Sequence, residues 1–206
     1  YTDVANTGVF TVMYVLIVPF ISYFVFSKKI HWSVWFAAFF CVIGGLLLSE
    51  LKNISVRYGD TLGVLSAFCW AIHIIYISKT IKFFNFPITI AMSQCLIAFL
   101  FTLLPMFAYE EPLINNILKE SYEILYVGAL SSGLAFLLQT YTLQNLTPAP
   151  AAIIFSLEGM FAAIFAWLIL DQFLNETKIF GIFLILSAVI LSQIIPIYDK
   201  KKYEQN

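Results

Sequence analysis

The sequence predicts an all-α fold, a polytopic membrane helix bundle with seven transmembrane helices. Of the 206 residues, 61% are hydrophobic and only 11% are charged, whereas soluble domains carry about a quarter. Apolar windows of about 20 residues, the length that crosses a hydrocarbon core, alternate with charged or turn-forming clusters. The predicted spans cover residues 5–26, 31–49, 61–79, 87–108, 122–143, 149–170 and 177–197.

Each span is bounded by residues that disfavour the membrane interior or interrupt a helix. The boundaries, in chain order, are Lys28 and Lys29, Glu50, Asp60, Lys79 and Lys82, Glu110 and Glu111, Glu123, the segment 144–150, Asp171, Lys178 and Lys200. The segment 144–150, with the sequence QNLTPAP, separates the fifth span from the sixth, because its two prolines break helix continuity.

Loop charges predict the orientation. One side of the membrane receives seven lysines, in the loops after the first and third spans and in the tail, and the other receives four basic residues. Because basic loops stay in the cytoplasm, we expect a cytoplasmic C-terminus, an external N-terminus and a bacterial inner (plasma) membrane location. The net charge of −1 and the absence of a basic stripe argue against nucleic-acid binding.

The chain also shows a faint internal symmetry. A shift of 144 residues lays residues 11–47 over 155–191 without a gap, matching hydropathy and turn placement. The two copies lie five spans apart, so they would be inverted relative to each other. Inverted repeats of this kind are typical of transporters, with the substrate site near the midplane between the repeats.

Three segments resemble motifs of the EamA-type drug/metabolite transporter superfamily, and the likeness covers nearly the whole chain. They are residues 156–170 (SLEGMFAAIFAWLIL), residues 59–71 with Gly59-Asp60 and SAFCWA, and residues 128–140 with GALSSGLAF and Gln139-Thr140. The resemblance implies a ten-helix fold of two inverted five-helix repeats. Here the chain would supply the fourth to tenth helices, with three helices missing at the front.

On this template, residues 1–50 hold the last two helices of the first repeat, 59–197 form the second, complete repeat, and 198–206 form a cytoplasmic basic tail. One residue departs from the family pattern. The family usually has proline after the glutamate of the ninth span, whereas this chain has Gly159. We expect the glycine to loosen the helix at that point.

Glu158 is the first candidate for a functional residue. It is the only Asp, Glu, Lys or Arg between Ile124 and Leu170, and it lies about 12 Å along the helix from Pro150, near the middle of the span. A charged side chain at that depth costs about 2.5 to 3.5 kcal/mol on insertion scales, so it normally faces protein or water. It could bind a proton or a cationic substrate, or it could hold helices together through hydrogen bonds.

Ser66, Trp70 and His73 in the third span are spaced i, i+4, i+7 and share one helix face. Trp70 could stack on an organic substrate or a cation, and His73 could relay protons. Alternatively, both side chains interlock neighbouring helices.

Four further residues are candidate pathway residues. Ser132 and Gln139 are seven residues apart on one face of the fifth span, and Gln139 could bond Glu158, the substrate or another helix. Tyr14 occupies the repeat position that matches Glu158, and Gln94 is a weaker candidate in the fourth span.

Together these features predict a secondary active transporter, an exporter of small organic metabolites such as amino acids or aromatic or cationic compounds. It would work by alternating access, coupled to protons through Glu158. Buried Lys or Arg for phosphate substrates, a nucleotide-binding loop, a nucleophile motif and metal-ligand spacing are all missing, so we expect no enzyme, catalytic residue, cofactor or metal site. The expected partners are a small-molecule substrate, membrane lipid and the proton. An intramembrane enzyme or a structural membrane subunit without transport activity remains the alternative.

Overall fold

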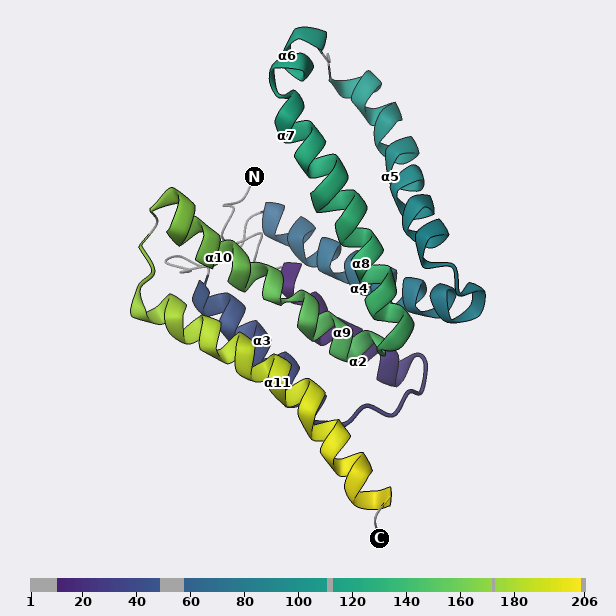
Figure 1. Cartoon of the computed structure of the whole chain (residues 1–206), viewed down its shortest axis with the longest axis vertical. Coiled ribbons are helices and arrows are strands. Elements are labelled where there is room, and N and C mark those ends of the chain that lie inside the picture. Colours follow the sequence, from purple (N-terminus) through teal and green to yellow (C-terminus); the bar gives the residue numbers. More distant parts are fainter. Residues whose placement is uncertain (1–10, 49–57, 111–112, 172, 205–206) are drawn as a thin grey trace. The chain divides into compact units, whose positions relative to one another are not determined.

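The computed structural model describes residues 11–48, 58–110, 113–171 and 173–204, and the regular structure of these residues is entirely helical (Figure 1). The elements are α2 (Tyr14–Phe24), α3 (Trp32–Leu48), α4 (Tyr58–Phe84), α5 (Pro87–Tyr109), α6 (Ile114–Lys119), α7 (Ser121–Tyr126), the π-helix η1 (Val127–Leu134), α8 (Ala135–Asn145), α9 (Pro148–Phe155), α10 (Leu157–Leu170) and α11 (Glu176–Glu204). The all-α prediction is confirmed.

Five of the predicted spans coincide with helical stretches long and apolar enough to cross a membrane. These are Thr61–Phe84, Pro87–Tyr109, Ser121–Asn145, Pro148–Leu170 and Glu176–Tyr198. The first two predicted spans correspond to the shorter apolar helices α2 and α3. Residues 5–10 of the first span and residue 49 of the second lie outside the described residues.

The helix ends follow from local residue chemistry. Pro87 and Pro148 stand in the first turn of α5 and α9, where the missing N–H costs no helical hydrogen bond. Asn85 and Asp171 adopt left-handed backbone conformations, with φ of 56° and 51°, directly after α4 and α10. Short polar side chains tolerate this conformation, and it ends each helix.

The chain divides into two compact units, residues 1–75 with 147–206, and residues 76–146. In the first unit the most extensive helix contact is between α3 and α11, which lie side by side in Figure 1. Gly44 and Gly181 form the closest point of this contact: a Cβ added to either one would lie 2.8 Å from the carbonyl oxygen of the other. The absence of both side chains is what allows the two backbones to approach.

Buried positions recur at the same intervals on the two helices of this pair. Ala37, Cys41 and Gly44 are buried on α3, and Gly181, Ile185 and Ala188 are buried on α11. The shift of 144 residues superposes these two sets one to one. The spacing of four and three residues is that of one helix face.

The second unit is built around the packing of α5 against α8 and η1. The Gln94 amide nitrogen on α5 donates to the Thr140 hydroxyl on α8 at 3.2 Å, and this hydroxyl donates to the Phe136 carbonyl at 2.7 Å. Near the turn between α4 and α5, the Gln144 side chain donates to the Asn85 side chain. The pair is therefore fastened by side-chain amides as well as by apolar contact.

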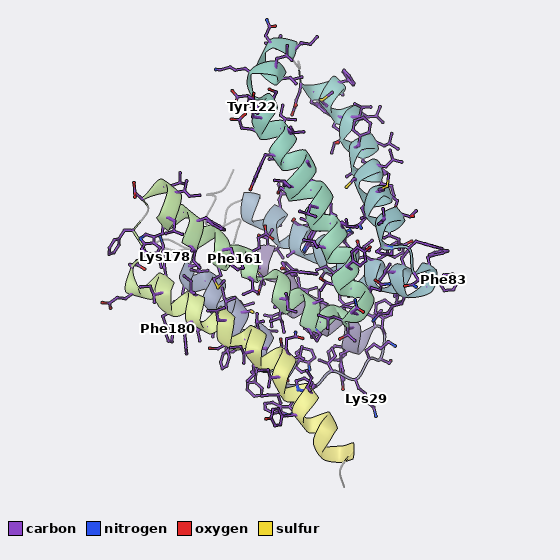
Figure 2. All side chains as sticks on the ribbon, viewed as in Figure 1. Lys29, Phe83, Tyr122, Phe161, Lys178 and Phe180 are labelled. Atoms are coloured by element: carbon purple, nitrogen blue, oxygen red, sulfur yellow. The ribbon has the colours of Figure 1, made fainter. Side chains whose placement is uncertain are left out.

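Large apolar side chains point outward from both units, as the stick view shows for Phe180 in the first unit and for Phe83 and Tyr122 in the second (Figure 2). Within the second unit, α5 buries only Ile90 and Ala91, and α7 buries no residue. Such an apolar exterior is the opposite of a soluble surface and suits contact with lipid or with further apolar helices.

Candidate functional site

The sixth predicted span is interrupted at Ser156, between α9 and α10. The Ser156 backbone keeps helical dihedral angles, φ −64° and ψ −12°, but the amide of Gly159 reaches back only three residues, to the Ser156 carbonyl at 3.3 Å. Glu158 is thereby placed in the first turn of α10.

A matching interruption precedes α2. Met13 lies between a helical stretch at residues 11 and 12 and the start of α2 at Tyr14, with φ −56° and ψ −20°. The Met13 carbonyl accepts from the Leu16 amide, three residues on, at 3.0 Å and from the Ile17 amide, four residues on, at 3.2 Å. Under the shift of 144 residues, Met13 falls within one residue of Ser156.

The two interruptions lie in the same unit, and α2 packs against α9. Tyr14, the first residue of α2, is 7% exposed. Tyr14 and Glu158, the two residues that the repeat correspondence paired, therefore lie in the same unit, and their joint role stays a prediction.

Cys41 and Ser156 form a buried polar contact between α3 and the irregular turn. The Cys41 sulfur on α3 lies 3.2 Å from the Ser156 hydroxyl, and both side chains are buried. The sequence analysis selected neither Cys41 nor Ser156 as a candidate residue. A thiol and a hydroxyl inside apolar runs give no signal of their own, and a contact 115 residues apart appears only in the folded chain.

The Glu158 side chain is exposed on α10, and among the described residues it has no hydrogen-bond or ion-pair partner. Gly159, expected to loosen the helix, lies inside α10, and a Cβ added to it would meet nothing within 4 Å. The irregular turn begins at Ser156, and the Gly159 amide makes its three-residue hydrogen bond, so the loosening effect of the glycine stays a prediction. A carboxylate without a cation beside it can take up a proton or a positively charged ligand.

The Ser66, Trp70 and His73 face lies on α4. The Trp70 and His73 rings stack with centroids 5.0 Å apart and planes tilted by 33°. Both are half-buried, whereas Ser66 is exposed. The structure thus joins the two aromatic residues into one surface and leaves Ser66 outside that contact.

Gln139 is 7% exposed in the second unit, and its Oε1 has no hydrogen-bond partner among the described residues. The amide of Gln94 is engaged in the contact between α5 and α8 already described, so its observed role is helix pairing. Gln139 and Glu158 belong to different units, and the hydrogen bond predicted between them stays a prediction.

Ser132 lies in η1, the π-helix that interrupts the fifth span. The argument that placed Ser132 and Gln139 on one face assumed regular α-helical spacing, which holds only from Ala135 onward. A Cβ on Gly133 would lie 3.3 Å from the carbonyl of Gly128, five residues earlier, as expected for a π-turn. Segments of this type are rare and often occur at functional sites.

Comparison with known proteins identifies the family. The model of the EamA-like transporter family matches residues 57–193, about two thirds of the chain. The chain belongs to the EamA-like transporter family. Together with the five membrane-spanning helices, this establishes an integral, multi-pass membrane protein of the drug/metabolite transporter type. It also favours a transporter over an enzyme.

Two curated relatives bear transporter names. An uncharacterized transporter of Archaeoglobus fulgidus is 28% identical over 192 residues, covering 93% of this chain and 61% of the relative. The putative permease-like protein YdzE of Bacillus subtilis is 33% identical over 67 residues, covering 32% of this chain and 86% of the relative. The chain thus spans about three fifths of the longer relative.

One solved crystal structure superposes on this EamA-like chain with a TM-score of 0.79. It covers 94% of this chain and 70% of the other, at 13% sequence identity. At that identity the likeness shows the fold alone. Among the described residues, no group of three or more His, Cys, Asp or Glu could hold a metal ion.

Proposed function

We propose that this EamA-like chain belongs to a secondary active transporter that exports small organic metabolites by alternating access. In this proposal Glu158 binds the coupling proton or a cationic substrate. The observation that carries it is the pair of irregular turns in apolar helices at Met13 and Ser156, with Tyr14 one residue after the first and Glu158 two residues after the second. Discontinuous helices at corresponding positions of two repeats are where transporters of several folds hold their ligands.

The repeat assignment is part of the proposal. Residues 1–50 would be the last two helices of one five-helix repeat, residues 59–197 the other repeat, and 198–206 a cytoplasmic basic tail. The extensive contact of α3 with α11 supports it, because the shift of 144 residues makes these two helices equivalent and equivalent helices of inverted repeats meet around a pseudo-twofold axis. The excess of lysine in alternate loops supports a cytoplasmic C-terminus in a bacterial inner membrane.

Amino acids, aromatic metabolites and organic cations form the proposed substrate class. The apolar spans offer aromatic surfaces such as the stacked Trp70 and His73, and one carboxylate, Glu158. Aromatic faces and an anion suit a substrate with an amino group or an organic cation. Substrates rich in phosphate would need Lys or Arg at depth.

A vesicle assay tests the proposal. The protein as encoded by its gene is reconstituted with an imposed pH gradient, and flux is measured for a panel of amino acids, aromatic amines and lipophilic cations. We expect gradient-driven flux of at least one compound and a loss of at least about tenfold in Glu158→Gln, a difference of about 1.4 kcal/mol. Glu123→Gln, at an exposed carboxylate of α7, is the matched control and should transport normally.

Transport by Glu158→Gln at the wild-type rate, with unchanged dependence on the gradient, would contradict this role. A protein without flux of any panel compound in either direction would favour a structural or regulatory membrane subunit instead.

A further inference from the structure

The hydrogen bonds of Ser156 explain only part of the break between α9 and α10. The Ser156 hydroxyl donates to the Ile153 carbonyl at 2.6 Å, one turn earlier, and the side chain is 3% exposed. A serine bonded to its own helix in this way competes with the backbone N–H groups for the carbonyl and tends to bend the helix.

Ser187 shows that such a bond alone does not interrupt a helix. Its hydroxyl donates to the Phe183 carbonyl at 2.8 Å, yet α11 continues without a break from Glu176 to Glu204. Thr140 also has a partner on another helix, the Gln94 amide, but its hydroxyl bonds four residues back and α8 continues through it. Ser156 combines a bond three residues back with a partner on another helix, the Cys41 thiol at 3.2 Å.

The direction of the Cys41–Ser156 bond follows from the hydrogen inventory. The single hydroxyl hydrogen of Ser156 goes to Ile153, so the thiol hydrogen of Cys41 must be the donor in the second contact. The chain of bonds therefore runs from Cys41 on α3, through the Ser156 hydroxyl, to the carbonyl of Ile153 in α9. Cys41 is 0% exposed, so water does not compete for its thiol.

We propose that Cys41 and Ser156 act together as positioning residues, which hold the break between α9 and α10 and so set the direction in which Glu158 leaves the helix. Glu158 follows Ser156 by two residues, within the first turn of α10. The Cys41 bond fixes the break to α3, the helix that packs against α11 in the same unit. This inference rests on the proposed function for its consequence in transport, but its structural part stands separately.

Amide hydrogen exchange of the whole protein in lipid nanodiscs tests the structural part without any substrate. In Ser156→Ala the carbonyl of Ile153 becomes free to accept a backbone N–H, so the helix should close. We expect the amides of residues 157–159 to exchange about tenfold more slowly than in wild type. Cys41→Ala should shift the same amides in the same direction, and Cys41→Ser, which keeps a donor, should not. Ser187→Ala is the matched control and should leave these amides unchanged.

The pH profile of transport tests the consequence. Ser156→Ala and Cys41→Ala should displace the pH midpoint of flux, whereas Cys41→Ser should keep the wild-type midpoint. Unchanged exchange at residues 157–159 in both alanine variants would overturn the inference. The inference would also be overturned if exchange slows and Glu158→Gln abolishes flux, but the pH midpoint of flux in the alanine variants equals that of the wild type. If exchange slows but Glu158→Gln transports normally, the structural role stands and the proposed function fails.

Discussion

Replacing Gly44 by alanine is expected to loosen the packing of α3 on α11, the most extensive helix contact in its unit. A Cβ at Gly44 would lie 2.6 Å from Cγ1 of Ile185 and 2.8 Å from the carbonyl oxygen of Gly181. The same substitution at Gly181 would place a Cβ 2.8 Å from the Gly44 carbonyl oxygen and 3.1 Å from the Cβ of Leu47.

The magnitude follows from what can move. Ile185 could turn its side chain, but a helix carbonyl cannot, so the two helices must separate by several tenths of an ångström. Overpacking of this kind costs about 1 to 3 kcal/mol. The better helix propensity of alanine returns up to about 1 kcal/mol. Subtracting this gain from the overpacking cost leaves an expected net loss of up to about 2 kcal/mol for Gly44→Ala, and a similar loss for Gly181→Ala.

Reversible unfolding of the full chain in detergent by increasing sodium dodecyl sulfate, followed by circular dichroism, measures this loss. The double variant should lose clearly less than the sum of the single variants, because both methyl groups strain one crossing point and the first already separates the helices. The reasoning is refuted if Gly44→Ala unfolds at the same or a higher detergent fraction than wild type, or if the two losses add fully.

Three further predictions use the same unfolding measurement. Gly159→Ala should stabilise the chain by up to about 1 kcal/mol, because the added methyl group meets no atom within 4 Å. A loss of stability instead would mean that a larger assembly occupies that space. Thr140→Val should cost about 0.6 to 1.7 kcal/mol by removing the acceptor of the Gln94 amide, and an equal loss in a Gln94→Leu background would disprove the coupling. Asn85→Ala should cost about 1 to 2 kcal/mol of stability, because alanine disfavours a φ of 56°, whereas Asn85→Gly should keep most of the stability. A glycine variant less stable than the alanine variant would exclude the left-handed cap.

Hydropathy predicted where the long helices lie but not where they end. The third span was expected to stop at residue 79, yet α4 continues to Phe84 and ends only at the left-handed Asn85. The last was expected to stop at residue 197, whereas α11 runs to Glu204. Lysine leaves the membrane interior but remains a good helix former, so charge marks the membrane boundary and not the end of the helix.

Only part of the candidate site left a trace in the sequence. A lone acid in a long apolar run singled out Glu158, and the repeat shift led from it to Tyr14. The break at Ser156 and its bond to Cys41 depend on which helices meet, and this information is absent from hydropathy. The π-helix was missed because the prediction used a single helical period; Gly128 and Gly133, five residues apart, were the available hint.

Thiol labelling at position 158 tests the central claim most directly. The variant Glu158→Cys is made in a background where Cys69 and Cys95, the two cysteines that are not fully buried, are replaced by alanine. The account predicts modification by a charged, membrane-impermeant thiol reagent added to vesicles, because the side chain looks into a water-filled pathway. Failure of the charged reagent from both sides of the membrane, while a small apolar maleimide reacts fully, would contradict the account and place the Glu158 side chain against lipid.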